Sequence, residues 1–199
     1  VVLYFKTLVK NFEVLKRLFL AILPTAAIGL IFYKIIKTYL LQSEAVVLIS
    51  LLLGGIFLII FEKFHREKPD IVENLENISY KQSFIIGIFQ SIAVIPGVSR
   101  AAATIVGGLI LGLKRKTIVE FSFLLAVPTM LAATGFDLIK SAGSFSSDQF
   151  GLLAVGFITS FIVAIFAVKF LLRFIENRTF TSFGVYRVIV AIVLWLVMF

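Results

Sequence analysis

Long apolar runs separated by short charged segments dominate this sequence. Five of them approach or reach the ~20 residues that a helix needs to cross about 30 Å of hydrocarbon. Pro24 and Pro128 lie inside two of these runs, which membrane helices tolerate. The pattern therefore predicts five transmembrane helices within a single polytopic domain covering residues 1–199: from Leu18 to Tyr33 or as far as Tyr39, Ala45 to Phe61, Ile118 to Leu138, Gly151 to Leu172, and Phe183 to Phe199.

One further apolar region is interrupted by a break, and neither half is long enough to span the membrane. The halves run from Phe84 to Ile95 and from Thr104 to Leu113, with Pro96, Gly97, Ser99 and Arg100 between them. Proline and glycine both interrupt helices. Non-helical backbone at membrane depth must be buried in protein or line a wet cavity. We therefore predict a re-entrant helix hairpin at about residues 83–113.

The charges between the apolar runs favour this hairpin over a single crossing. If the hairpin returns to the side from which it entered, fourteen Lys and Arg residues share one side, and only Lys34, Lys37 and Lys140 lie on the other. A single crossing would divide them nine to eight. Basic residues concentrate in cytoplasmic loops. We therefore expect the hairpin to enter from the cytoplasm, residues 62–79 to form a cytoplasmic loop, and the C-terminus to lie outside.

Composition agrees with an all-α integral membrane protein. The chain is 60% hydrophobic and 15% charged, with a mean hydropathy of +1.09, whereas soluble domains are about half apolar and about a quarter charged. The net charge of +8 fits cytoplasmic loops and anionic lipid headgroups, so membrane lipid is the expected partner and nucleic acid is not. The absence of cysteine and the single histidine exclude disulfides, thiolate metal sites and a His-rich metal site.

The chemistry is expected at the break. An arginine in a membrane segment costs at least ~2.5 kcal/mol on insertion scales and usually marks function. Arg100 and Thr104 are four residues apart and therefore share one helical face. Gly97 permits a close backbone approach, and the helix after the break offers free N–H groups to an anion. The guanidinium, these N–H groups and the hydroxyls of Ser99 and Thr104 would converge on a phosphate, whose geometry an Arg fork matches.

Other polar residues allow more ordinary interpretations. Arg100 itself could be an arginine that merely ends the hairpin. Gln90 lies within reach of the break, where it would either contact substrate or make an interhelical hydrogen bond. Glu120 and Asp137 could face the two membrane surfaces, and Arg187 could pair with an acid or a carbonyl. Gly108 and Gly112 form a small-xxx-small pattern that would let another helix pack closely.

Several motifs together resemble the undecaprenyl-diphosphate phosphatases of the bacitracin-resistance family. The resemblance covers nearly the whole chain. It rests on Phe89-Gln90 before Pro96, the Pro-Gly-x-Ser-Arg-x-x-x-Thr block that ends at Thr104, the run from Glu120 to Pro128, the run from Val155 to Thr159, and Tyr186-Arg187.

The resemblance implies an enzyme of the bacterial inner membrane that hydrolyses the terminal phosphate of an isoprenyl lipid diphosphate. Its product would be the carrier lipid of peptidoglycan synthesis, and its activity would confer bacitracin resistance. The resemblance gives Arg100, Ser99 and Thr104 catalytic roles, and we expect Pro96, Gly97 and Gln90 to bind substrate. It also implies Mg²⁺ or Ca²⁺ as a cofactor, with no metal ligands in this chain.

The sequence departs from the family pattern in two places. Ala101-Ala102 stand where the family often has Ser-Gly. The family's upstream re-entrant segment, with its glutamates and histidine, is not in these 199 residues. We therefore expect the chain to be the C-terminal part of an inverted-repeat bundle, and to be inactive alone.

Two other functions are compatible with the pattern. A broken helix at mid-membrane is also typical of transporters, which would make the chain a transporter or flippase of an anionic isoprenyl lipid. The chain could also be a non-catalytic membrane fragment. The sequence is compatible with a homodimer.

Overall fold

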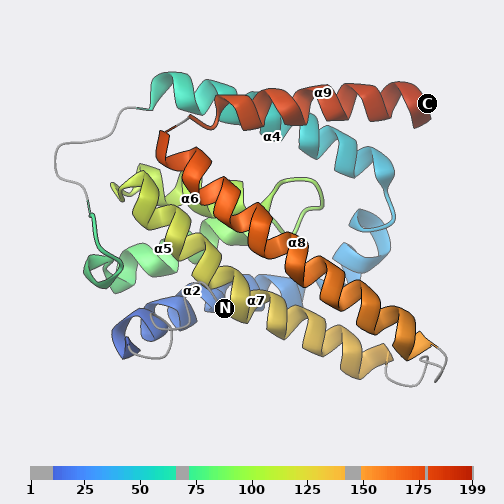
Figure 1. The fold of residues 1–199 in the computed structure, drawn as a ribbon, viewed down its shortest axis with the longest axis horizontal. Coiled ribbons are helices and arrows are strands. Elements are labelled where there is room, and N and C mark those ends of the chain that lie inside the picture. The colour runs from blue at the N-terminus through green and yellow to red at the C-terminus, as the bar shows by residue number, and fades with distance from the viewer. Residues whose placement is uncertain (1–10, 66–71, 142–148, 178, 199) are drawn as a thin grey trace.

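The structure, a computed structural model, describes residues 11–65, 72–141, 149–177 and 179–198, and it is built from helices (Figure 1). Within these ranges, five helices are long and apolar enough to cross a membrane. This confirms the predicted all-α membrane architecture. The five are α2 (Phe12–Ile31), α4 (Glu44–Phe64), α7 (Arg115–Ser141), α8 (Gln149–Asn177) and α9 (Thr181–Met198).

The ends of these helices differ from the ends of the apolar runs because capping side chains determine where a helix starts. Helix α2 begins at Phe12, well before the predicted Leu18, since Asn11 Oδ1 accepts a hydrogen bond of 3.3 Å from the Val14 N–H. Such a bond satisfies one of the free donors at a helix N-terminus. The same helix ends at Ile31, and α3 (Tyr33–Ile35) and the π-helix η2 (Ile36–Leu40) follow it.

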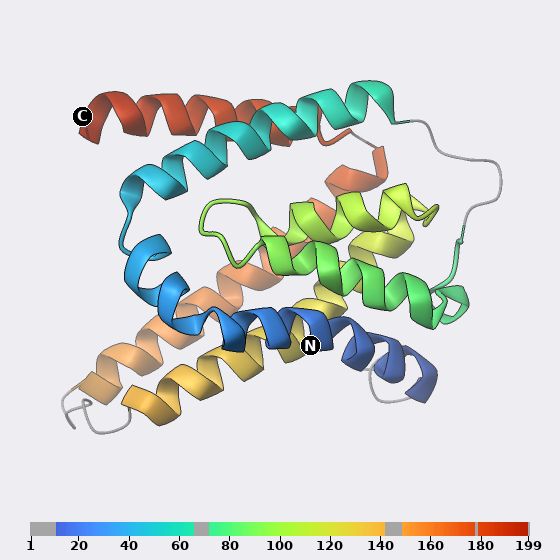
Figure 2. The same cartoon turned by 180° about the vertical axis from the view of Figure 1, so that it is seen from behind.

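Two short helices, α5 (Tyr80–Ile92) and α6 (Arg100–Ile110), occupy the predicted hairpin. Each has its own N-cap: Ser79 forms a capping box with Gln82 on α5, and Ser99 caps α6. The loop that joins them lies at one end of the pair, opposite the segments that lead in and out (Figure 2).

The two ends of the hairpin are joined by main-chain hydrogen bonds. Val72 N–H donates to the Gly112 carbonyl and Lys114 N–H donates to the Val72 carbonyl, both at 3.0 Å. Gln82 Nε2 adds a bond of 3.1 Å to the Leu111 carbonyl. The chain therefore enters and leaves the hairpin at the same end of the bundle, as a re-entrant segment requires.

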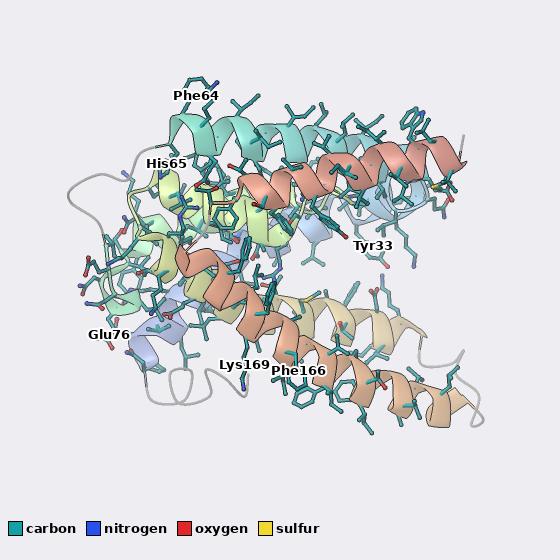
Figure 3. The ribbon with its side chains drawn as sticks, turned by 45° about the horizontal axis from the view of Figure 1, so that its top comes forward. Tyr33, Phe64, His65, Glu76, Phe166 and Lys169 are labelled. Atoms are coloured by element: carbon teal, nitrogen blue, oxygen red, sulfur yellow. The ribbon has the colours of Figure 1, made fainter. Side chains whose placement is uncertain are left out.

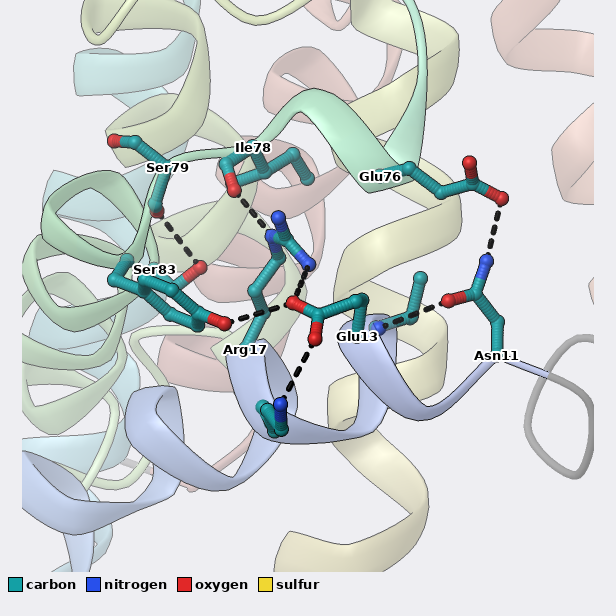
Figure 4. A network of polar contacts seen from close by, with 10 residues as sticks. Asn11, Glu13, Arg17, Glu76, Ile78, Ser79 and Ser83 are labelled. Carbon is teal, nitrogen blue, oxygen red and sulfur yellow. Dashed lines mark hydrogen bonds and ion pairs between the residues drawn. The ribbon is translucent and has the colours of Figure 1, made fainter.

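A network of polar contacts surrounds this end (Figure 4). Glu13 of α2 pairs with Lys16 and Arg17 and accepts a hydrogen bond of 2.7 Å from the Tyr80 hydroxyl. Arg17 also donates to the main-chain carbonyl of Ile78. These contacts join the N-terminus of α2 to the segment that enters the hairpin, which includes the 3₁₀-helix η3 (Leu75–Asn77).

Beyond the C-terminal end of α2, α3 and η2 meet the C-terminal part of α7. The ammonium groups of Lys37 and Lys140 lie 5.7 and 4.0 Å from the ring centroid of Tyr33. Lys16 and Arg17 of the larger basic group therefore lie at one end of the bundle, and Lys37 and Lys140 of the smaller group lie at the other. Which end faces the cytoplasm stays a prediction.

Small residues let the helices of the bundle approach closely. A Cβ at Gly55 of α4 would lie 2.8 Å from the Gly184 carbonyl oxygen of α9, and a Cβ at Gly87 of α5 would overlap the main chain of α2 at Ala21. Helices α4 and α9 consequently run side by side along their lengths (Figures 1 and 2).

The α6 glycines only partly follow the predicted small-xxx-small pattern. Gly108 packs against Ile118 of α7, where a Cβ would overlap the side chain. Gly112, however, lies beyond the end of α6 and has a positive φ of 81°. It reverses the chain instead of packing against a helix. Residues 104–109 of α6 are all buried, so the second half of the hairpin lies inside the bundle.

Helix α8 lies at the periphery of the bundle. No residue of its apolar stretch Gly151–Leu171 is buried. Phe166, 69% exposed, and Lys169 project away from the other helices (Figure 3). In a membrane protein, this surface faces lipid or another apolar partner.

Candidate functional site

The loop between α5 and α6 has an unusual backbone. Gly97 has a φ of +89° and Ser99 a φ of +76°. A Cβ at Gly97 would lie 2.5 Å from the Val47 carbonyl oxygen of α4. Glycine is therefore required here, but the close approach that we predicted toward a ligand is made to α4. Pro96, next to it, is half-buried in the same loop.

Ser99 begins α6 in a conformation that is costly for a residue with a side chain. Positive φ in a non-glycine residue costs on the order of 1–3 kcal/mol and clusters at functional sites. Its Oγ accepts a hydrogen bond of 3.3 Å from the Ala102 N–H. The hydroxyl proton is not used in that bond, so Ser99 can still donate to an anion, and its catalytic role stays a prediction.

Free main-chain donors gather at the same point. Within the described part of the chain, the N–H groups of Ser99, Arg100 and Ala101 make no hydrogen bond. The first N–H groups of a helix have no intrahelical acceptor and carry the positive end of the helix dipole. The start of α6 therefore has the donors that an oxyanion requires.

Arg100 is half-buried and extends from α6 toward α7. Its Nη1 donates to the Ser122 carbonyl at 3.2 Å, which is the only hydrogen bond of this side chain to a described residue. The remaining guanidinium donors are therefore available to a ligand. A fixed guanidinium with free donors is suited to bind phosphate in a bidentate manner.

Thr104 shares the face of Arg100, as the spacing predicted, but its side chain is fully buried. Its Oγ1 lies 3.0 Å from the carbonyl oxygens of Arg100 and Ala101 and 2.6 Å from the Ser122 hydroxyl. These contacts occupy the hydroxyl, so Thr104 reaches the site indirectly, by holding α6 against α7. Its catalytic role stays a prediction. Ser122, to which no role was assigned from the sequence, contacts both Arg100 and Thr104.

Gln90 joins three helices in the interior of the bundle. Its Nε2 donates to Thr25 Oγ1 of α2 at 2.9 Å and to Thr129 Oγ1 of α7 at 3.4 Å. This is the interhelical bond that the sequence analysis left open. Its Oε1, however, is buried with no partner among the described residues. An acceptor buried without a donor is costly, so this oxygen can still take a donor from a substrate or a water molecule.

Arg187 of α9 is the main residue that the sequence analysis underrated. It is only 3% exposed and donates to three main-chain carbonyls, those of Gly97 at 2.6 Å, Val98 at 3.1 Å and Ser50 at 3.3 Å. The carbonyl alternative considered for it is therefore confirmed. An arginine in an apolar helix was the available signal, but only the fold shows that it reaches the break.

The other polar candidates are dispersed. Glu120 is half-buried in the first half of α7, and Asp137 is exposed near its far end. Among the described residues, no three His, Cys, Asp or Glu side chains come together in a way that could hold a metal ion. These residues therefore do not fit the divalent cation that the resemblance implies.

A separate groove of about 700 Å³ lies between α2 and α7. Its walls are apolar except near Lys16 and Tyr80, so the donors required for phosphate are found at the break and not in this groove. The lining residues are Phe12, Leu15, Lys16, Leu18, Phe19, Leu20, Ile22, Tyr80, Val127, Pro128 and Leu131.

Comparison with known proteins relates this chain to a single family. The family model of the bacitracin resistance protein BacA matches residues 4–193. An undecaprenyl-diphosphatase of Aquifex aeolicus is 49% identical over 193 residues, which are 97% of this chain and 75% of the relative. Undecaprenyl-diphosphatases of Persephonella marina and Methanococcus aeolicus are 44% and 42% identical, over 97% and 92% of this chain and 75% and 71% of the relatives.

Proposed function

The chain belongs to the bacitracin resistance protein BacA family, and from this we infer that it hydrolyses undecaprenyl diphosphate to undecaprenyl phosphate and inorganic phosphate. The reaction recycles the carrier lipid for peptidoglycan synthesis and confers bacitracin resistance. The protein is a multi-pass protein of the bacterial inner membrane, with five helices that can span it. Its relatives are named as diphosphatases, which does not favour the transporter or the non-catalytic fragment.

We propose that the terminal phosphate binds at the start of α6. The support is the set of free donors that residues 99–101 carry: the guanidinium of Arg100, the Ser99 hydroxyl, and the N–H groups of Ser99, Arg100 and Ala101. Gly97 and Pro96 shape the loop that presents them. Gln90 lies on the preceding helix, and its unpaired Oε1 can accept a hydrogen bond from a water molecule.

The reaction places negative charge on phosphate oxygens that face these donors. Water attacks the terminal phosphorus, the bond from that phosphorus to the bridging oxygen breaks, and the bridging oxygen leaves with undecaprenyl phosphate. Charge spreads over the three equatorial oxygens of the transferring group, so catalysis depends on positioned donors. Arg100 and the α6 N–H groups are already fixed before substrate binds, which lowers the reorganisation that the reaction requires.

The test is phosphate release from undecaprenyl diphosphate by the full-length protein in detergent. Arg100→Ala should lower kcat by at least about 100-fold, the typical loss when one oxyanion donor is removed. Arg100→Lys should also lose most activity, because an ammonium group is a point charge without the planar fork.

Membrane insertion and thermal unfolding of both variants serve as controls and should match the unsubstituted protein. Full phosphate release by the Arg100→Ala variant would remove the break from the mechanism. A lack of phosphate release by the unsubstituted protein would refute the assigned reaction itself.

We further propose that activity requires Mg²⁺ or Ca²⁺. The support is the resemblance alone, because the described carboxylates do not gather into a metal site, and we assign no step to the ion. Exhaustive treatment with EDTA should abolish phosphate release, and either ion should restore it. Unchanged release after chelation would reject the proposal.

A homodimer is our remaining proposal. The support is α8, whose apolar stretch Gly151–Leu171 is unburied and could be covered by a second copy as well as by lipid. The molar mass of the detergent-solubilised protein, corrected for bound detergent, should be twice that of the chain. The mass of a single chain would reject the dimer.

A further inference from the structure

Arg187 has no role yet in the proposed reaction, although its contacts meet at the phosphate-binding loop. Its guanidinium is nearly fully buried, and its hydrogen bonds to described residues all go to main-chain carbonyls, on Ser50 of α4 and on Gly97 and Val98 of the loop. Its Nε has no partner within the described residues. Burial of an uncompensated charge in a membrane helix is costly and usually functional.

Without their hydrogen bonds to Arg187, the carbonyls of Gly97 and Val98 would be unfavourable neighbours for an anion. A carbonyl oxygen carries the negative end of the peptide dipole and repels phosphate. Because a peptide unit is planar and trans, its N–H points opposite to its carbonyl. With the Val98 carbonyl directed to Arg187, the N–H of Ser99 points away from Arg187. That N–H is one of the donors left free at the start of α6.

The same bonds explain how Ser99 keeps its positive φ. A strained residue persists only where the surrounding structure restricts it. On one side of Ser99, its own Oγ is bonded to the Ala102 N–H. On the other side, Arg187 holds the two preceding carbonyls. Without these bonds, the loop could relax to a negative φ and the free N–H groups would no longer converge.

We propose that Arg187 is a positioning residue for hydrolysis: it withdraws the Gly97 and Val98 carbonyls from the anion and thereby presents the α6 N–H groups to the terminal phosphate. This inference rests on the proposed function. Small residues make the reach possible, since Gly55 and Gly184 bring α4 and α9 together, and a Cβ at Gly54 would lie 2.5 Å from Nη2 of Arg187.

Arg187→Lys and Gly54→Ala in the full-length protein test the proposal. Lysine keeps the charge but cannot hold three carbonyls as a planar fork does, and the added methyl group displaces the guanidinium without removing a donor. Both variants should lower kcat per folded protein by on the order of 100-fold, because small misplacements of catalytic groups have effects of this size. The inhibition constant of inorganic phosphate should rise at least about tenfold, since the α6 donors no longer converge.

Matched controls separate positioning from simple packing. Arg17→Lys alters another arginine that donates to a main-chain carbonyl, that of Ile78 at the opposite end of α5, and Gly29→Ala adds a methyl group where no atom lies within 4 Å. Neither should change kcat or phosphate inhibition.

The outcomes are distinct. Normal kcat and phosphate inhibition in the Arg187→Lys variant, with only a lower unfolding temperature, would assign Arg187 to packing and overturn the proposal. If this variant does not fold, the same normal values in the Gly54→Ala variant would overturn it. A lack of phosphate release by the unsubstituted protein would instead refute the proposed function.

Discussion

The two threonine hydroxyls beside Gln90 donate their protons to main-chain carbonyls and therefore act toward its amide as acceptors. Thr25 donates to the Gly87 carbonyl at 3.1 Å, and Thr129 donates to the Leu125 carbonyl at 2.7 Å. Each hydroxyl has one proton, so both can only accept from Gln90. This determines the orientation of its amide: Nε2 faces the two threonines, and Oε1 faces away, with no donor among the described residues.

We expect substitution of Gln90 to change the activity of the protein much more than its stability. Gln90→Leu removes two hydrogen bonds of about 1 kcal/mol each but also removes an unsatisfied buried oxygen that costs about 1–3 kcal/mol. The free energy of unfolding should therefore change by less than about 1 kcal/mol, while phosphate release falls if the oxygen contacts substrate. Unfolding in SDS and the release assay measure the two effects. Unchanged release would restrict Gln90 to its interhelical role.

Gly97 should not tolerate even a methyl group. In Gly97→Ala, the positive φ costs on the order of 1–3 kcal/mol, and the added Cβ would approach the Val47 carbonyl oxygen to 2.5 Å. We expect a lower unfolding temperature and a large loss of phosphate release. In contrast, Gly29→Ala lies in open space within α2 and should leave stability equal or higher by up to about 1 kcal/mol. Equal effects of the two substitutions would contradict the loop geometry.

At the scale of elements, two ion pairs near the ends of the hairpin differ in burial. Arg115 of α7 holds Glu62 of α4 through two bonds, of 2.7 and 3.2 Å, with side-chain exposures of 18% and 6%. Lys114 and Glu73 form a single bond of 3.0 Å with exposures of 45% and 63%. A buried pair is strongly weakened by loss of one partner, whereas an exposed pair contributes little.

Glu62→Ala should therefore lower the free energy of unfolding by about 2 kcal/mol or more, since it removes one partner of a largely buried ion pair. The matched variant Glu73→Ala should cost less than about 1 kcal/mol. Unfolding in SDS at low and high salt compares them. Similar losses in both variants would mean that the pair between α4 and α7 does not hold these helices together.

For the whole molecule, the charge pattern predicts an orientation that can be tested directly because the chain contains no cysteine. Single cysteines can be placed at Asn74, near the polar end, and at Gln42, between η2 and α4; both positions are exposed. The positive-inside rule predicts that a membrane-impermeant maleimide labels Gln42→Cys in intact spheroplasts and Asn74→Cys only after lysis. The reverse pattern would invert the topology.

The membrane class, the five spanning helices and the break at residues 96–100 could all be predicted from the pattern along the chain. These features follow from local composition, because hydrocarbon thickness sets the length of an apolar run and proline and glycine interrupt helices wherever they occur. Arg100 was identified in the same way, since a charge inside an apolar run is conspicuous without any knowledge of the fold.

The residues that surround that break become known only from the way the helices pack. Arg187 follows the Gly97 and Val98 carbonyls that it holds by about ninety residues in the chain, and Ser122 meets Arg100 and Thr104 from a different helix. The close approach of Gly97 to α4, and not to a ligand, was equally unpredictable. Such partners depend on how helices pack, and packing follows from contacts between side chains distant in sequence, which a pattern along the chain does not record.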